Sequence, residues 1–349
     1  MKKAKDHLIS GFTVSMKTKK TIPSKIKHES FLIGILYLVG TLSLCEDAIR
    51  RGRPYVYPTI TILQLLVIKS WMRIPSNNTL HYFLSLEDAN RKKIRDICRL
   101  HQIPDRRTFD RRFKALPIRQ IIANMGSVFL SEKLVDCTTA SVDSSLLKAT
   151  GPVWHKSDMK QNRIPISGID VDARWGFSKA KGWIFGYKLH MSCSTGRLIV
   201  PLSADFTTAN IADNQMYHSL VNPLANLLQN IIADPAYDDG NLYRISSEFN
   251  IRLVCPVKKY DHTPPERLAL VEFYESEKGQ EIYQSRKISI EPLFEILKDT
   301  FGIRVLPVRG FENVKSFVLV CVLAYQLMVY YNCVTEQENP RTVKRMLCN

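Results

Sequence analysis

The sequence predicts an α/β fold, a mixed sheet with flanking helices, preceded by an all-α region. In residues 31–130 the apolar positions recur at the three-to-four spacing of helices, as in FLIGILYLVGTL and ITILQLLVIKSWM. From about residue 131 onward, short runs rich in Val, Ile and Cys alternate with helical segments, which is the pattern of a sheet covered by helices. At 349 residues the chain is long enough to bury a substantial core.

The chain is strongly basic, with a formal net charge of +16 and an isoelectric point near 9.5. A metabolic enzyme does not need such an excess, whereas a protein that binds a polyanion gains affinity by neutralising phosphates and releasing counterions. The charge therefore favours nucleic acid as the partner. Eight cysteines are scattered without a CxxC pair, so we expect reduced core thiols in a cytoplasmic protein and no zinc or dithiol redox site.

Residues 1–30 carry eight lysines against few acids and show no apolar period. We expect a mobile basic arm, which either contacts DNA or remains a solvated tail. The arm lacks the long apolar stretch and the small-residue cleavage site of a secretory signal. Residues 31–130 then form the helical region, which is expected to bind DNA ends.

Within the helical region, the segment IPDRRTFDRRFKAL has the features of a basic helix. Pro104 and Asp105 form a helix start, and Phe109 and Phe113 fall on one face at i and i+4. A short helix, a turn at HQIPD and this helix would form a helix-turn-helix-like reader of the major groove, whereas the alternative is a merely basic surface helix. The arginines expected to contact DNA are Arg106, Arg107, Arg111 and Arg112.

Residues 131–313 are expected to form the sheet domain. VDCTTASVDSS, GWIFGYKLHMSCS and GRLIVPLSADF read as three strands, the last two joined by a hairpin at Thr195 and Gly196. They are followed by helix, strand, helix, strand and helix. This order is that of a ribonuclease-H-like domain, in which the first and fourth strands lie side by side at the centre of the sheet.

Three carboxylates stand where this order would bring them together. Asp143 and Asp234 end apolar runs, and Glu291 opens a segment with helical spacing. Each acid alone could be a turn residue, a helix cap or a solvated acid, but their joint placement favours a catalytic cluster. Since burying three carboxylates is costly unless cations neutralise them, the cluster predicts Mg²⁺ or Mn²⁺, two ions in each site, and in-line phosphodiester displacement. The stretch between Asp234 and Glu291 leaves no room for a large insertion, so we expect a compact catalytic domain.

The segment SFVLVCVLAYQLMVYY, residues 316–331, is apolar almost throughout. Its apolar run is interrupted by Gln326 and is shorter than the roughly twenty residues that a membrane-spanning helix needs. We therefore expect a buried core helix and no membrane partner, with residues 314–349 forming a C-terminal core helix and tail.

In these residues the chain resembles the DDE transposases of prokaryotic insertion sequences, in the group with a Tyr-Arg-Glu-Lys signature around the last acid. The motifs that carry the resemblance follow in order along the chain, and it is strongest from Asp143 onward. They are WHKSD at 154–158, DVDARWGFS at 170–178, GWIFGYKLH at 182–190, ADPAYDD at 233–239 and RKISIEPLFEILK at 286–298. Together these motifs are specific, although none would suffice alone.

The resemblance implies roles for particular residues. The implied catalytic, metal-binding triad is Asp143, Asp234 and Glu291. The residues implied to contact DNA phosphates near the cleaved end are Tyr283, Arg286 and Lys298, with Lys188 of GYKLH as a further candidate.

The signature departs from the family pattern in its spacing. Four residues separate Arg286 from Glu291 where three are expected, so either Arg286 or Lys287 is the signature cation. Pro292 directly after Glu291 disfavours an uninterrupted helix, because its ring clashes with the preceding turn. We therefore expect Glu291 at a helix start or kink, with Glu295 as the alternative third acid.

The function implied is that of a transposase that binds the terminal inverted repeats of its own element, cuts the DNA ends with metal and joins them to target DNA. The alternatives are a metal-dependent nuclease of the same fold that cuts without joining, and a DNA-binding regulator with an inactive site. Pairing two DNA ends takes at least two protomers, so we expect a homodimer on double-stranded DNA. We expect the protein in the cytoplasm, at the nucleoid when it is bound to DNA.

Overall fold

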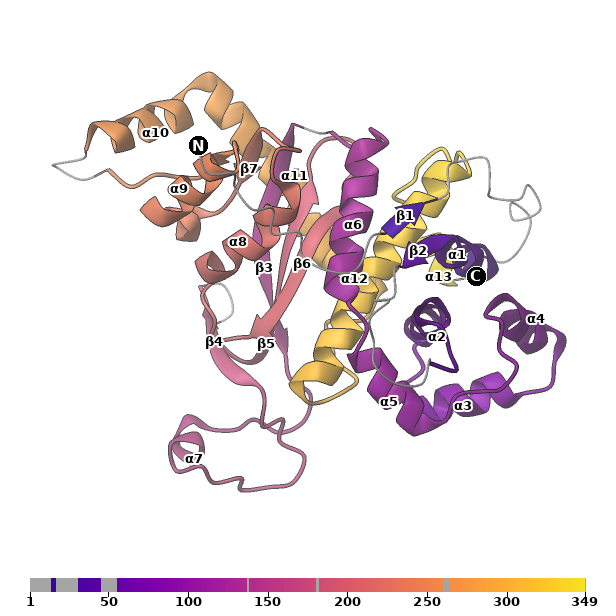
Figure 1. The fold of residues 1–349 in the computed structure, drawn as a ribbon. Helices are drawn as coiled ribbons and strands as arrows, with labels where there is room; N and C mark the ends of the chain where they lie inside the picture. Colours follow the sequence, from indigo (N-terminus) through magenta and orange to yellow (C-terminus); the bar gives the residue numbers. More distant parts are fainter. Residues whose placement is uncertain are drawn as a thin grey trace, which may run out of the picture.

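The computed structural model describes residues 14–16, 31–44, 55–136, 138–179, 182–259 and 264–348. Apart from its short strand, the basic arm expected over residues 1–30 lies outside the described residues. Figure 1 shows a sheet with helices on both sides and, beside it, a group of helices from the N-terminal part of the chain.

The N-terminal part is helical, as expected. Its helices are α1 (Phe31–Gly40), α2 (Thr59–Trp71), α3 (Asn77–Ser85), α4 (Ala89–Ile97), α5 (Arg106–Lys114) and α6 (Ile118–Ser131). Ser76, Asp88 and Asp105 begin α3, α4 and α5 because the side chain of each accepts a backbone N–H three residues on. The region is not all-α, however. Strand β1 (Val14–Met16) pairs antiparallel with β2 (Leu42–Leu44), two runs too short to show a period in the sequence.

The strands of the large sheet are β3 (Thr139–Lys148), β4 (Arg174–Ser178), β5 (Gly182–Ser194), β6 (Pro201–Thr208), β7 (Asn230–Ile232) and β8 (Arg252–Val254). The long strand β5 pairs antiparallel with β3, β4 and β6. On its other edge β3 pairs parallel with β7, and β7 pairs parallel with β8. The expected neighbours, first and fourth strands of the domain, are thus confirmed. Strand β4 was not expected, since RWGFS is only five residues long.

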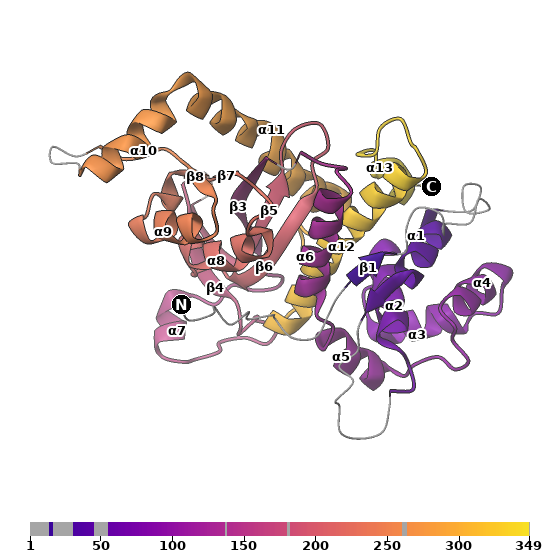
Figure 2. The same cartoon turned by 45° about the horizontal axis from the view of Figure 1, so that its top comes forward.

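The remaining elements connect and cover the strands. They are α7 (Lys156–Lys160), η3 (Asp213–Met216), α8 (Tyr217–Val221), η4 (Asn222–Leu224), η5 (Pro235–Tyr237), α9 (Gly240–Glu248), α10 (Pro265–Glu275), α11 (Glu277–Thr300), α12 (Phe311–Val334) and α13 (Lys344–Cys348). In Figure 2, α10 lies beyond β8 at one side of the sheet, and α11 runs back from it to pack on β3 and β5.

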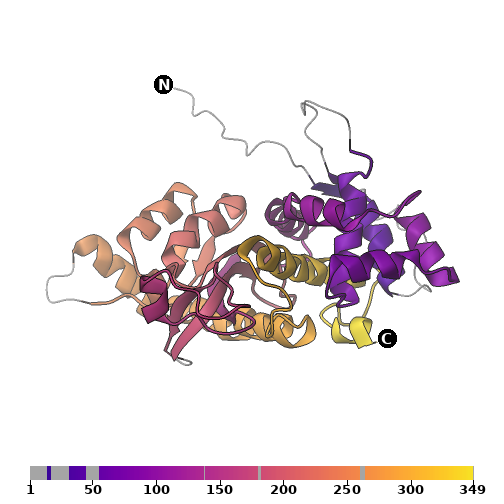
Figure 3. The ribbon, with the colours of Figure 1, turned by 90° about the horizontal axis from the view of Figure 1, so that it is seen from below.

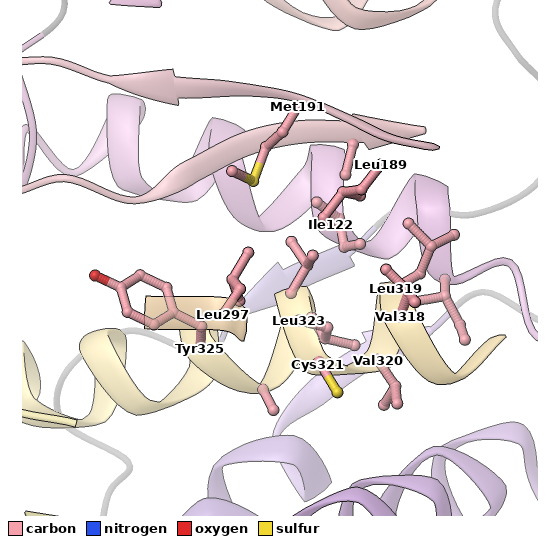
Figure 4. Packing of buried hydrophobic residues seen from close by; sticks show 14 of the residues in the cluster. Ile122, Leu189, Met191, Leu297, Val318, Leu319, Val320, Cys321, Leu323 and Tyr325 are labelled. Carbon is pink, nitrogen blue, oxygen red and sulfur yellow. The ribbon is translucent and has the colours of Figure 1, made fainter. Parts of the chain in front are cut away.

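Helix α12 lies between the sheet and the N-terminal helices and joins the two (Figures 1 and 3). Figure 4 shows Leu319 and Leu323 of α12 facing Ile122 of α6 and Leu189 of β5. Gln326, the polar interruption, is fully buried and donates to the backbone carbonyl oxygens of Ile122 and Pro201 at 3.0 and 2.8 Å. By length and composition α12 could cross a membrane, but 83% of its apolar window is buried inside the protein, as expected for a core helix.

Helix α6 belongs to the same core as the sheet. It packs directly on β6, and a Cβ at Gly126 would lie 2.2 Å from the carbonyl oxygen of Leu202. Only glycine permits this close approach. One hydrophobic cluster therefore runs from α1 and α2 through α12 to the strands, so the two parts of the chain are not packed separately.

Candidate active site

The parallel pairing of β3 and β7 places two of the predicted acids at one level of the sheet. The last paired residues are Ser141 and Ile232, and Asp143 and Asp234 each follow two residues later. Asp143 accepts the backbone N–H of Ser144 at 2.7 Å. Asp234 caps η5 by accepting the backbone N–H of Ala236 at 2.9 Å. Asp234 is therefore both a turn residue, which was one alternative, and a carboxylate at the level of Asp143 on the sheet.

Glu291 of helix α11 is linked to Asp143 by an arginine of the same helix, Arg286. The guanidinium of Arg286 donates to Asp143 Oδ2 at 2.5 Å and to Glu291 Oε1 at 3.1 Å, so the cation spans the two carboxylates. Lys287, the alternative signature cation, is exposed. The structure thus brings Arg286, and not Lys287, onto the acids.

Glu291 lies inside the continuous helix α11 and not at a helix start, which corrects that part of the expectation drawn from Pro292. The ring removes one backbone hydrogen bond, to the carbonyl of Ile288, a residue on the solvent side of the helix with 62% of its surface exposed. Against this loss, Ile290, Leu293 and their neighbours on the opposite face are buried in the core. Packing therefore outweighs the local preference.

Burial and neighbouring acids raise the pKa of Asp143. Burial is the main reason that the pKa of Asp143 rises to about 6, and the charges of Asp234 and Asp213 add to it, whereas Arg286 and the Ser144 N–H oppose the rise. Tyr237 of η5 is fully buried, and its hydroxyl has no hydrogen-bond partner in the part of the chain that the structure describes. Burial, followed by the nearby charges of Asp213, Asp143 and Asp234, raises the pKa of Tyr237. Asp143 thus lies in a buried region of negative charge, whereas Glu291 is exposed at its edge.

A second polar cluster adjoins Asp143 and was missed from the sequence. Asp213 of η3 accepts the Ser144 hydroxyl and the Lys188 ammonium, both at 2.8 Å. The buried ring of His190 lies 3.8 Å from the same carboxylate oxygen and also hydrogen-bonds Thr207 at 2.8 Å. Burial lowers the pKa of His190 to about 4, so the ring is neutral at pH 7, as expected for a structural strand residue.

The structure corrects the expectation for Lys188. It was expected as an exposed lysine that contacts DNA, but only 8% of its surface is exposed and its ammonium is held by Asp213 and by the carbonyl of Ile211. A lysine and a histidine two positions apart on a strand share one face. A buried strand face that carries a lysine needs an acid to neutralise it, and this need was the sequence signal for an acid such as Asp213.

Helix α5 has the basic surface expected, with one exception. A short helix, α4, precedes it across the turn at HQIPD, and Arg106, Arg107 and Arg111 are exposed. Arg112 is buried instead. Its guanidinium donates to the carbonyl of Tyr57 at 2.9 Å and lies 3.4 Å from the ring centre of Tyr55. The prediction that Arg112 contacts DNA is therefore wrong, since that side chain ties α5 to the start of α2.

Comparison with known families identifies the chain. Residues 138–327, more than half of the sequence, match the family model described as transposase DDE domain. The chain belongs to the DDE transposases. No curated protein matches it. Among solved structures, it is similar to the piggyBac transposase in a synaptic complex with hairpin DNA, determined by cryo-electron microscopy. The two chains are 12% identical over 97% of this chain and 81% of that one, with a TM-score of 0.40.

DDE transposases generally depend on divalent metal ions. The donor chemistry of this site fits, because its acids offer hard carboxylate oxygens and a cation, the Arg286 guanidinium, already lies between two of them. Among the described residues, however, no three His, Cys, Asp or Glu side chains lie close enough to hold one ion.

The other signature residues of this transposase line α11. Tyr283 is half-buried and packs edge-to-face on Tyr274 with ring centres 5.3 Å apart. Lys298 is buried, with 8% of its surface exposed, and donates to Glu295 at 2.9 Å. Glu295, the alternative third acid, is also held by Arg304, and the hydrogen bond from Lys298 is the main cause that lowers its pKa. No contact joins Glu295 to Asp143 in the described residues.

Proposed function

We propose that this transposase binds the terminal inverted repeats of an insertion sequence, cleaves the DNA ends by two-metal phosphodiester hydrolysis and transfers the strands to target DNA. The observation that supports the proposal is that parallel strands bring Asp143 and Asp234 to one level of the sheet while Arg286 of α11 bonds both Asp143 and Glu291. The strand order β6-β5-β3-β7-β8 supports a ribonuclease-H-like catalytic domain, for which we retain residues 131–313.

In this proposal the chain's own residues hold and orient the reacting groups. Two Mg²⁺ or Mn²⁺ ions, when bound, would supply an activated hydroxyl and stabilise the leaving oxygen. Asp143 would hold them from the middle of β3, Asp234 from just beyond the end of β7, and Glu291 from α11. Rigid placement matters because displacement at phosphorus needs the attacking and leaving oxygens in line.

DNA would be held by exposed cations of α5 and by less exposed residues of α11. We propose that α5 contacts the terminal repeats through Arg106, Arg107 and Arg111, since these side chains are exposed on one helix. Tyr283, Arg286 and Lys298 are proposed to lie near the cleaved end. Lys298 can do so only if DNA replaces its contact with Glu295. Two protomers on double-stranded DNA, in the cytoplasm, complete the proposal.

The test uses purified protein, a duplex carrying the terminal repeat of its element, a target plasmid, and Mg²⁺ or Mn²⁺. The proposal predicts a metal-dependent nick at the element boundary and a joined product with the plasmid, both resolved on a sequencing gel. Nicks without joined products would replace it with a nuclease. Specific binding with no nick under any metal condition would replace it with a regulator.

A further inference from the structure

Arg286 occupies the place between two catalytic acids. Its terminal nitrogens lie 2.5 Å from Asp143 Oδ2 and 3.1 Å from Glu291 Oε1, and only 14% of its side chain is exposed. A planar guanidinium is the side chain best able to bridge two carboxylates in this way. Within the described residues, no other side-chain cation contacts Asp143, and the nearby Lys188 is already held by Asp213.

The ion pairs that Arg286 makes with Asp143 and Glu291 leave part of its hydrogen-bonding capacity unused. The third nitrogen of the guanidinium, Nε, is buried and has no hydrogen-bond partner among the described residues. Asp234 is within electrostatic reach of Asp143 but has no cation bonded to it in the described residues. An arginine whose only role was to stabilise the fold would be expected to satisfy all its donors, since unpaired buried groups cost free energy. The arrangement therefore fits a temporary partner for the acids.

We infer that Arg286 is the resident counter-ion of the acids in the free protein, and that DNA opens the metal site by giving this guanidinium a phosphate to bind instead. The inference rests on the proposed function, in which DNA lies at this site. The coupling requires that the guanidinium leave the carboxylates when it binds a DNA phosphate. DNA binding and metal binding are then coupled through Arg286, and the coupling is reciprocal. The free protein would hold divalent ions weakly, which limits cleavage of DNA that is not properly docked.

The alternative is a fixed ion pair that persists when metal and DNA bind. The two differ in what happens when the arginine is removed. Removal of either kind of cation takes away a repelling charge and strengthens metal binding, but only removal of a resident counter-ion also abolishes the gain in metal affinity that DNA gives.

The experiment measures Mn²⁺ binding to the full-length chain by electron paramagnetic resonance of the free ion, without a cleavage step. Arg286→Gln is compared with wild type and with Lys287→Gln, an exposed neighbour on the same helix. We expect Arg286→Gln to bind Mn²⁺ about tenfold more tightly or better, corresponding to the loss of one competing cation. Lys287→Gln should match wild type. Arg286→Lys keeps the positive charge but loses the two-pronged guanidinium geometry, so its Mn²⁺ affinity should lie between those of wild type and Arg286→Gln.

The second arm adds the terminal-repeat duplex, with its own Mn²⁺ binding subtracted and its binding to protein followed by fluorescence anisotropy. DNA should tighten Mn²⁺ binding by wild type and leave Arg286→Gln unchanged. Equal Mn²⁺ affinity of wild type and Arg286→Gln without DNA would overturn the inference, as would an equal effect of DNA on both. Asp143→Asn serves as the site control. If it leaves Mn²⁺ binding intact, the proposed metal ligands are wrong, which is a separate failure.

Discussion

Replacing Asp143 by Asn should stabilise the fold at neutral pH while removing a catalytic group. The carboxyl of Asp143 is only 16% exposed, and its pKa is raised from 3.8 to about 6. An acid whose pKa is higher in the folded state than in the unfolded chain is less favourably ionised after folding. Asn keeps the shape of the side chain without the charge, so it removes that penalty.

The magnitude follows from the shift. A rise of about two pH units corresponds to about 3 kcal/mol of unfolding free energy. The penalty is fully present above the folded pKa, near pH 7 to 8. It shrinks as the pH falls below about 6, because the folded state takes up its proton first, and is nearly lost at pH 4. Asp143→Asn should thus exceed wild type by about 3 kcal/mol at pH 8 and by less than about 1 kcal/mol at pH 4.

The assay is urea denaturation of both proteins at pH 8, 6 and 4, followed by circular dichroism. Glu295→Gln is a control of opposite sign, since the pKa of Glu295 is lowered by its hydrogen bond to Lys298. That substitution should weaken the fold at pH 8 and have less effect as the pH falls. A destabilised Asp143→Asn at pH 8 would show that the Arg286 contact outweighs burial, and would refute the reasoning.

Three further predictions concern contacts away from the acids. Arg112→Ala should lower the unfolding free energy measured in urea by about 2 to 4 kcal/mol, because the Tyr57 carbonyl and the Thr59 hydroxyl lose the donor that Arg112 supplies. Arg111→Ala, at an exposed position, should change stability by less than about 0.5 kcal/mol and should weaken DNA binding in anisotropy titrations. Lys188→Met should cost roughly 3 kcal/mol, since it leaves the partly buried Asp213 without its cation. Adding Asp213→Asn should recover part of that loss in a double-mutant cycle. Gly186→Ala should cost at least about 1 to 3 kcal/mol in thermal unfolding, because its Cβ would lie 2.0 Å from a backbone carbonyl oxygen of β3; unchanged melting would contradict this.

The sheet and two of the acids could be predicted because they depend on local patterns. Apolar runs that end in Asp143 and Asp234 define strands, and a strand order with parallel β3 and β7 leaves those residues level. Cysteine burial was also predictable from apolar neighbours: Cys98, Cys193, Cys255 and Cys321 are buried and unpaired. Three other cysteines, at 45, 137 and 348, lie where side chains are not described.

What could not be predicted depends on contacts between distant segments. Arg112 and Lys188 have the same local sequence features as exposed cations. Arg112 is buried only because α5 packs on α2, and Lys188 because it is held by Ile211 and Asp213. Pro292 has a strong local preference that the buried face of α11 overrides. Asp213 begins the short helix η3, which shows no periodic pattern in the sequence, so its role appears only when its partners on β3 and β5 are brought to it.

The catalytic role of the three acids is tested most directly by Mn²⁺-dependent cleavage of the terminal-repeat duplex. Four alanine variants are compared with wild type, at Asp143, Asp234, Glu291 and Glu295, each checked for folding and DNA binding. The account predicts that the first three lose cleavage by several orders of magnitude while retaining DNA binding, and that Glu295→Ala keeps cleavage. Cleavage that survives in Glu291→Ala and is lost in Glu295→Ala would contradict the site described here.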